Sequence, residues 1–318
     1  MSKPKVLVTR RWPQAVEEKM AQIFDLSLNT SDTPLTESEF TAALGQYDAI
    51  LPTVTDRLPA AVFESTAPRT RILANYGVGF AHIDTAAAKD RGIAVTNTPD
   101  VLSECTADIA MTLMLMVARR AGEGERELRD GRWTGWRPTH MIGTKVSGAT
   151  LGIIGFGRIG RAVAQMAFGL GMRVSAFDPG TADASVSVSF ADGQSLTFQA
   201  DLLSLAEVLS SSDFVTVHVG GKSQVLGAAE LAQMKPGSIL INAARGGVVD
   251  EVALLHALDH GPLAAAGLDV FVNDPTPAVQ VLMHPKVSLT PHIGAATLEA
   301  QDRIGVELAD QLIALANA

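Results

Sequence analysis

Short apolar segments with the character of β-strands alternate with helical segments along almost the whole chain. In the first hundred residues the expected strands are 5–9, 25–29, 48–52, 71–74 and 92–96. A second series follows at 150–155, 173–177, 214–219, 238–242, 266–271 and 287–290. Strands joined through helices pair in parallel, because a crossover connection returns the chain to the same end of the sheet. The alternation therefore predicts an α/β fold of two doubly wound parallel sheets, each covered by helices on both faces.

The length of 318 residues exceeds what one hydrophobic core usually serves, so two domains are expected. An amphipathic helical segment follows the last strand, and we expect it to return to the first domain. This organisation predicts a discontinuous flavodoxin-like substrate domain, 1–100 plus 293–318, with a Rossmann nucleotide-binding domain, 101–292, inserted between its parts. Within the inserted domain we expect one long apolar helix over 103–127 and a small hairpin in 181–200.

Composition and motifs exclude several classes of function. The formal net charge of -9 leaves no basic surface for nucleic acid or an anionic membrane. The single cysteine, Cys105, excludes an internal disulfide and is expected to be a buried thiol in a reducing cytosol. The longest apolar segment, 109–118, is about half of the roughly 20 residues that a membrane span needs, and no signal-peptide pattern opens the chain, so we expect a cytoplasmic location. The stretch GKS at 221–223 is not a P-loop, because Thr216 stands where that motif needs a glycine.

The hexapeptide GFGRIG places Gly155, Gly157 and Gly160 in the G-x-G-x-x-G pattern of dinucleotide-binding loops. It follows an apolar strand and opens a helix, which gives a tight turn, close backbone approach and a helix N-terminus that faces a pyrophosphate. Asp178 ends the next strand, where an acid accepts hydrogen bonds from ribose hydroxyls and disfavours a 2′-phosphate. The alternatives are a plain βα turn and a helix cap. We expect NAD as the cofactor.

An oxidoreductase that acts on a carbonyl or hydroxyl group needs a cation for the substrate oxygens and a proton donor–acceptor. Arg245 follows an apolar strand, where ligands bind in open α/β sheets, and a guanidinium can hold a carboxylate bidentately. His292 also ends a strand, and Asp269 and Asp274 precede it. No metal site is expected, because the other histidines lack zinc-type spacing and are predicted to be surface or loop residues. These are His82, His140, His256, His260 and His284, with His218 expected on a strand beside the cofactor.

The sequence resembles the D-isomer-specific 2-hydroxyacid dehydrogenases, a family that includes D-3-phosphoglycerate dehydrogenase and glyoxylate/hydroxypyruvate reductase. The resemblance covers almost the whole chain. It is carried by NYGVGFAHID (75–84), VTNTPDVLSECTADIA (95–110), GIIGFGRIGRAVA (152–164), MKPGSILINAARGGVVDE (234–251), GLDVF (267–271) and LTPHIGAAT (289–297). Two further stretches, TVTDRL (53–58) and WTGWRPTHMIG (133–143), look most like the glyoxylate-reductase members.

The resemblance implies the reduction of a 2-keto acid to its D-2-hydroxy acid by NADH. It implies that Arg245 binds the substrate carboxylate and carbonyl, that His292 is the acid–base, and that the backbone amides of Val78 and Gly79 hold the carboxylate. Asp269 matches the residue that contacts the nicotinamide carboxamide. The family has a glutamate that orients the histidine, whereas this chain has Asp274. Because aspartate is one methylene shorter, the loop must lie closer, or the contact is weaker or mediated by water.

The other implied contacts line the cofactor cleft. By the same resemblance, Arg158 and Ile159 face the pyrophosphate, and the cleft is lined by Val219, Ala243 and Gly294. The segment HVGGKSQVLG (218–227) departs from the family, which usually has a proline here and a slightly longer loop.

Two alternatives and two further expectations follow. The family also contains NAD-sensing corepressors, in which the scaffold serves as a binding and oligomerisation module, and formate-type enzymes, which have a neutral amide in place of Asp274. Only Arg57 and Arg137 could add positive charge near the mouth, which favours glyoxylate or hydroxypyruvate over a phosphorylated acid such as 3-phosphoglycerate. The apolar helix and the arm with Trp133 and Trp136 suggest a homodimer.

Overall fold

The computed structural model describes residues 3–64, 67–99, 101–221 and 223–316. The chain forms two compact units. The first unit contains residues 1–102 and 295–318, and the second contains residues 103–294. The sequence-based boundaries, 1–100 plus 293–318 and 101–292, lie close to these.

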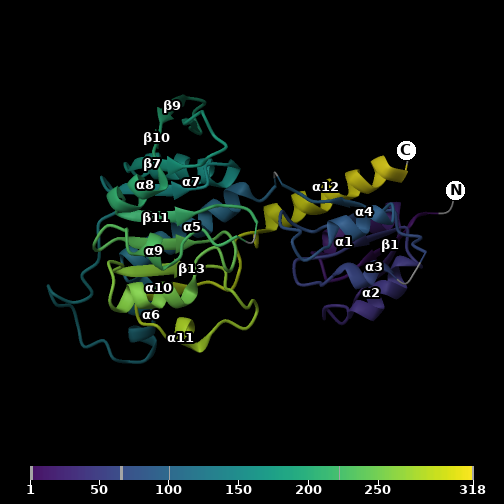
Figure 1. The fold of residues 1–318 in the computed structure, drawn as a ribbon, viewed down its shortest axis with the longest axis horizontal. Coiled ribbons are helices and arrows are strands. Elements are labelled where there is room, and N and C mark those ends of the chain that lie inside the picture. The colour runs from purple at the N-terminus through teal and green to yellow at the C-terminus, as the bar shows by residue number, and fades with distance from the viewer. Residues whose placement is uncertain (1–2, 65–66, 100, 222, 317–318) are drawn as a thin grey trace. The chain divides into compact units, whose positions relative to one another are not determined.

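The first unit, which includes the labelled strand β1 in Figure 1, is built on a five-stranded parallel sheet in the order β2-β1-β3-β4-β5. The strands are β1 (Lys5–Val8), β2 (Asp25–Leu28), β3 (Ala49–Leu51), β4 (Ile72–Ala74) and β5 (Ala94–Thr96). The register pairs Val6 of β1 with Leu26 of β2 and with Ala49 of β3. This strand order is that of flavodoxin-like folds, whose ligands bind beyond the carboxyl ends of the strands.

Apolar helix faces close the core of the first unit. Its helices are α1 (Gln14–Ile23), α2 (Glu37–Leu44), α3 (Ala60–Glu64), α4 (Thr85–Asp90) and α12 (Leu298–Ala316). Phe40 of α2 is fully buried with Ile50 and Leu73 of the sheet. The last helix, α12, packs against α1 and β4. Gly305 permits this approach, because a Cβ there would collide with the side chain of Val16.

The second unit contains a seven-stranded parallel sheet in the order β10-β7-β6-β11-β12-β13-β14. The strands are β6 (Thr150–Ile154), β7 (Arg173–Phe177), β10 (Asp201–Leu202), β11 (Phe214–Val217), β12 (Ile239–Asn242), β13 (Ala265–Leu268) and β14 (Val287–Leu289). Numbered within the unit, this order is 3-2-1-4-5-6 with one more strand at the end, which is the Rossmann order. The prediction of two doubly wound parallel sheets is confirmed. The two-residue strand β10 was not predicted.

The helices of the second unit are α5 (Ser103–Ala118), α6 (Ala121–Arg129), α7 (Arg158–Gly169), α8 (Leu205–Ser211), α9 (Ala228–Leu231), α10 (Glu251–Asp259) and α11 (Val279–Leu282). The prediction of one continuous helix over 103–127 is wrong, because Arg120 adopts a left-handed backbone conformation (φ 54°) between α5 and α6. A distant segment crosses the end of α5 there: the Thr144 amide donates to the Ala118 carbonyl at 2.7 Å, and Gly143 lies against the same oxygen. In the described part of the chain, no helix is long and apolar enough to cross a membrane.

The predicted hairpin is confirmed as the antiparallel pair β8 (Ser185–Ser189) and β9 (Ser195–Gln199). It is docked on α7 by an aromatic pair, Phe168 and Phe198, whose ring centroids lie 4.8 Å apart. Arg161 of α7 adds hydrogen bonds to the carbonyls of Asp183 and Ser185, at 2.6 and 2.7 Å. The hairpin thus takes the place of a helix after β7.

Candidate active site

The glycine-rich loop between β6 and α7 has the geometry of a phosphate cradle. Gly155 has φ +92°, and a Cβ there would lie 2.5 Å from the carbonyl oxygen of His218. A Cβ on Gly160 would collide with the carbonyl of Gly155, so neither position tolerates a side chain. Gly157 directly precedes α7, no side chain caps the first amides of that helix, and the space beside the Gly157 Cα is open. Because uncapped amides at a helix start bind anions, these residues fit the pyrophosphate of a dinucleotide.

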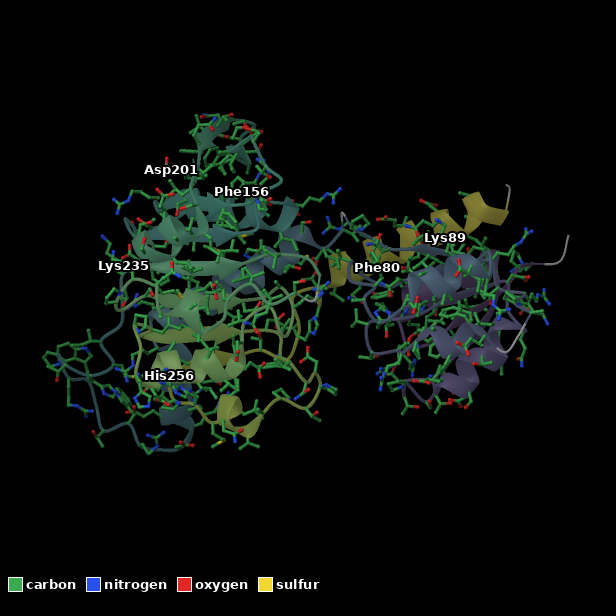
Figure 2. The ribbon with its side chains drawn as sticks, viewed as in Figure 1. Phe80, Lys89, Phe156, Asp201, Lys235 and His256 are labelled. Atoms are coloured by element: carbon green, nitrogen blue, oxygen red, sulfur yellow. The ribbon has the colours of Figure 1, made fainter. Side chains whose placement is uncertain are left out.

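Asp178 lies directly after β7 and is tied to this loop. Its Oδ2 accepts a hydrogen bond from the amide of Phe156 at 2.8 Å, and its Oδ1 accepts one from the amide of Gly180 at 2.8 Å. The guanidinium of Arg161 lies 4.8 Å from the ring centroid of Phe156, which is labelled in Figure 2. A carboxylate offers about four acceptor positions, so Asp178 keeps capacity for ribose hydroxyls.

Arg245 lies in the loop that follows β12. The side chain of Asn242 holds this loop. Its Nδ2 donates to the Arg245 carbonyl, and its Oδ1 accepts from the Ala244 amide, both at 3.1 Å. The guanidinium donates to the Ala244 carbonyl at 2.6 Å, and no carboxylate pairs with it within the described ranges. Burial lowers the pKa of Arg245. Because a desolvated cation is costly without a counter-charge, this group is suited to receive an anionic ligand.

His292 and Asp274 form a direct hydrogen-bonded pair. The distance from Nδ1 of His292 to Oδ2 of Asp274 is 2.9 Å, and the two side chains are 40% and 34% exposed. His292 has a left-handed backbone (φ 54°), which is rare for a residue with a side chain and is tolerated mainly at functional sites. The shorter acid therefore reaches the histidine without an intervening water.

Asp269 fixes the loop that carries His292. This carboxylate is buried directly after β13. Its Oδ1 accepts bonds from the Thr290 hydroxyl at 2.6 Å and the Ile293 amide at 2.9 Å, and its Oδ2 accepts the Gly294 amide at 2.9 Å. Three acceptor positions of about four are thus used within the protein, and one on Oδ2 is left for a donor such as a carboxamide.

The remaining predicted cofactor residues lie around the same loops. Arg158 and Ile159 are the first residues of α7, and Val219 approaches the glycine loop, with its Cγ1 3.1 Å from the position of a Cβ on Gly155. Ala243 is buried beside the Arg245 loop. A Cβ on Gly294 would lie 3.1 Å from Oδ2 of Asp269, so a glycine suits that contact.

The other histidines have structural surroundings. His218 follows β11, its Nε2 lies 2.9 Å from the Thr216 hydroxyl, and burial lowers its pKa to about 4. His140 pairs with Glu127 at 3.1 Å, and His284 pairs with Asp259 at 3.2 Å with its side chain only 9% exposed. Among the residues described, no three or more His, Cys, Asp or Glu side chains are grouped to hold a metal ion.

Val78 and Gly79 belong to the first unit, whereas Arg245, Asp274 and His292 belong to the second. The two residues lie in the loop after β4, at the carboxyl edge of its sheet. Sequence reasoning missed Asn75 and Asn97, whose side chains bind the carbonyls of this loop. The available signal was an asparagine directly after each of two neighbouring strands.

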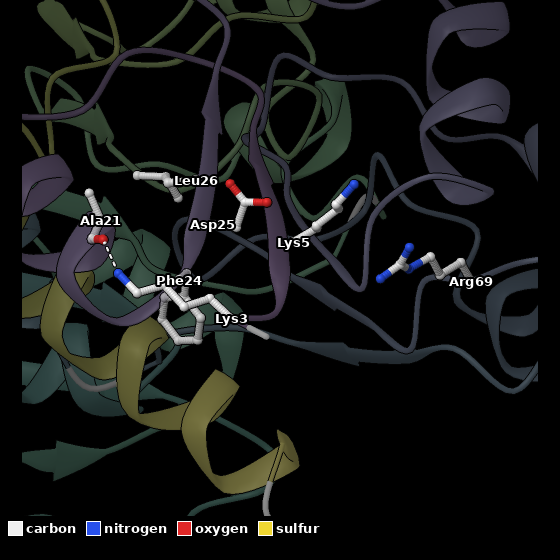
Figure 3. A pocket seen from close by; sticks show the side chains of 7 residues that line it. All are labelled: Lys3, Lys5, Ala21, Phe24, Asp25, Leu26 and Arg69. Carbon is white, nitrogen blue, oxygen red and sulfur yellow. Dashed lines mark hydrogen bonds between the residues drawn. The ribbon is translucent and has the colours of Figure 1, made fainter. Parts of the chain in front are cut away.

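A pocket of the first unit lies elsewhere. It measures about 510 Å³ and is lined by Lys3, Lys5, Ala21, Phe24, Asp25, Leu26 and Arg69 (Figure 3). Lys5 and Asp25 are the first residues of their strands, so the pocket lies at the amino edge, away from where parallel sheets bind ligands. Lys3 donates to the Ala21 carbonyl, and Arg69 is paired with Asp48. Lys222 of the GKS stretch lies outside the described residues.

A Rossmann unit with a phosphate cradle, an acid at the ribose position and basic and acidic side chains at the strand ends defines an NAD-dependent oxidoreductase. The family model for the NAD binding domain of D-isomer specific 2-hydroxyacid dehydrogenases matches residues 111–294. The chain belongs to the D-isomer specific 2-hydroxyacid dehydrogenase family. It is an NAD-binding enzyme that reduces 2-keto acids.

Three relatives illustrate the similarity. The glyoxylate reductase of Korarchaeum cryptofilum is 40% identical over 317 residues, which cover 98% of this chain and 92% of that protein. The glycerate dehydrogenase of Hyphomicrobium methylovorum is 35% identical, covering 99% and 97%. The crystal structure of an NADPH-dependent glyoxylate/hydroxypyruvate reductase from Sinorhizobium meliloti, with NADP and malonate, matches with a TM-score of 0.83 and 31% identity, covering 98% and 93%.

Proposed function

We propose that this enzyme reduces a small unphosphorylated 2-keto acid, such as glyoxylate or hydroxypyruvate, with NADH, and that His292 is its acid–base. The observation that carries the proposal is the direct 2.9 Å bond between His292 and Asp274. It gives a histidine at a strand end both an orientation and a charged partner, as proton transfer to a forming alkoxide requires. The curated relatives include a glyoxylate reductase and a glycerate dehydrogenase, which supports a short substrate.

The residues divide the work as follows. The nicotinamide, when bound, supplies the hydride, and the free acceptor position of Asp269 takes its carboxamide. The amides of Val78 and Gly79 hold the substrate carboxylate, and Arg245 holds the carboxylate and polarises the carbonyl. Because Nδ1 of His292 faces Asp274, Nε2 is the atom that gives its proton to the alkoxide. Asp274 stabilises the imidazolium before that transfer.

The test is a steady-state panel of 2-keto acids, each with NADH and with NADPH. We expect turnover of glyoxylate and hydroxypyruvate, a lower kcat/KM for a phosphorylated 2-keto acid, and a preference for NADH that follows from Asp178. If no 2-keto acid is turned over, the rival assignment as a binding and oligomerisation module gains support. If the phosphorylated acid is preferred, the proposed substrate class is wrong.

Asp274→Asn is expected to lower kcat about tenfold or more and to move the pH–rate profile. The amide keeps a hydrogen bond to His292 but removes the negative charge that favours the protonated imidazole. Reduction needs a proton on this imidazole, so the variant should turn over more slowly and its pH–rate profile should differ from that of the wild type. The measurement is kcat/KM for glyoxylate between about pH 5 and 10.

Asp274→Glu, which introduces the family residue, is the matched control and should retain the pH profile. If Asp274→Asn shows the same pH–rate profile as the wild type, Asp274 does not act as the catalytic partner of His292.

We also propose a homodimer and a cytoplasmic location. Leu128, Trp133, Trp136 and Ile142 are 60%, 51%, 81% and 66% exposed on α6 and the segment after it. Large apolar side chains this exposed mark interaction surfaces, and a second copy of the chain is the proposed occupant. Sedimentation velocity tests the dimer, and a purely monomeric protein would exclude it. The location rests on the single reduced cysteine, Cys105, and on cofactor use.

A further inference from the structure

Two asparagine side chains donate hydrogen bonds to all three carbonyls of the loop 77–79. Nδ2 of Asn75 donates to the carbonyls of Gly77 and Gly79, both at 3.0 Å. Nδ2 of Asn97 donates to the carbonyl of Val78 at 2.8 Å. Asn75 is fully buried at the end of β4, and Asn97 is half-buried directly after β5. The loop is therefore held by two side chains, each of which directly follows one of two adjacent strands, β4 and β5.

Fixing these carbonyls also fixes the amides. In a planar trans peptide the C=O and the next N–H point in opposite directions. With the carbonyls of 77, 78 and 79 turned toward the asparagines, the N–H groups of Val78, Gly79 and Phe80 turn away from them. No acceptor for these three amides is found among the described residues. Phe80 is labelled in Figure 2. Consecutive free amides of this kind form an anion-binding nest, and the φ of +118° at Gly77 allows the turn.

The arrangement has a cost that a purely structural loop would avoid. Oδ1 of Asn75 is buried with no hydrogen-bond partner within the described ranges. A buried unsatisfied acceptor typically costs about 1–3 kcal/mol. The opposite orientation of the amide would place this oxygen against two carbonyls, so both N–H donors are committed to the loop.

The supports are themselves anchored by the last helix. Nε2 of Gln311 on α12 donates to the Asn97 carbonyl at 3.0 Å. The Thr96 hydroxyl donates to Oε1 of Gln311 at 2.6 Å. Asn97 is thus fixed by α12 on its backbone and holds Val78 with its side chain.

We propose that Asn75 and Asn97 are positioning residues for the substrate carboxylate, which hold the nest of amides at 78–80 in place before the 2-keto acid binds. This rests on the proposed function, because the nest needs a carboxylate as its ligand. Neither asparagine touches the substrate. They lower the KM for it, since a preorganised nest need not be ordered at the moment of binding.

The experiment compares Asn97→Ala, Asn97→Asp and Asn75→Ala with a matched control, Asn29→Ala. Asn29 has the same task elsewhere in the unit, because its Nδ2 donates to the carbonyls of Thr9 and Thr33 at 2.8 and 2.7 Å. The readouts are KM and kcat for glyoxylate, KM for NADH, the binding of oxamate to the enzyme–NADH complex by fluorescence, and the melting temperature.

We expect Asn97→Ala to raise the KM for glyoxylate and the Kd of oxamate about tenfold, which is what the loss of one such hydrogen bond allows. Asn97→Asp should be worse, because a carboxylate cannot donate to Val78 and repels the substrate. The KM for NADH and the pH profile should not change, and Asn29→Ala should alter only the melting temperature.

If all variants lose the same stability as Asn29→Ala and keep the wild-type KM, the inference is wrong while the proposed function stands. If Asn75→Ala does not fold, the two Asn97 variants decide the question. If the wild-type enzyme neither turns over a 2-keto acid nor binds oxamate, the proposed function fails, and the inference fails with it.

Discussion

His292→Gln is expected to lower kcat for glyoxylate reduction by about 10²–10⁴-fold, the usual contribution of a general acid. The glutamine keeps a polar side chain at the end of the loop but cannot supply a proton near neutral pH. The loop should survive the change, because Asp269 holds it through the Thr290 hydroxyl and the amides of Ile293 and Gly294 rather than through the imidazole. The measurement is kcat at saturating glyoxylate and NADH.

Two controls separate lost chemistry from lost structure. NADH affinity, measured by fluorescence, should stay within about twofold of wild type, since His292 has no assigned part in cofactor binding. The pH–rate profile of the residual activity should also differ from that of the wild-type enzyme. A loss of kcat below about tenfold would mean that another group or water supplies the proton.

Arg245→Gln is expected to lower kcat/KM by at least about 10²-fold without loss of thermal stability. Activity is lost because removing one partner of a buried charge pair, here the cation that binds the substrate carboxylate, costs about 2–5 kcal/mol. Stability behaves differently, because the guanidinium is partly buried and the Ala244 carbonyl is its only hydrogen-bond partner among the described residues. Removing a partly buried cation that has no carboxylate partner relieves its partial desolvation, so the melting temperature should be unchanged or higher.

Arg245→Lys refines this test. An ammonium keeps the charge but lacks the planar pair of donors, so it should recover only part of the lost activity. Full recovery would show that charge alone is needed at this position. A large fall in the melting temperature of Arg245→Gln would show that the guanidinium stabilises the fold, which contradicts its assignment as a group kept for ligand binding.

The two sheets could be predicted because strand and helix patterns are local properties of the sequence. The hairpin at β8 and β9 was predicted for the same reason, from alternation around an Asp-Gly pair. The break at Arg120 could not be predicted, because it depends on Gly143 and Thr144 reaching the end of α5 from a distant segment. Local pattern predicted an uninterrupted helix there, and tertiary packing decided otherwise.

The site was predicted as a set of residues rather than as a geometry. The sequence suggested Asp274 as the partner of His292, but whether an aspartate reaches the ring depends on the path of two loops. The uncompensated charge of Arg245 and the support of the loop 77–79 by Asn75 and Asn97 are likewise properties of packing. A sequence pattern does not show which side chains lack a hydrogen-bond or charge partner in the folded protein.

The division of the first unit between two parts of the chain sets an order of assembly during synthesis. Residues 103–294 are contiguous, so the cofactor-binding unit can complete its strand pairing from one uninterrupted segment. The first unit lacks α12 until residues 298–316 have left the ribosome, and until then Asn97 lacks its anchor, Gln311. In a newly made chain the whole segment of the cofactor-binding unit is therefore synthesised before Gln311, which supports the loop 77–79 through Asn97.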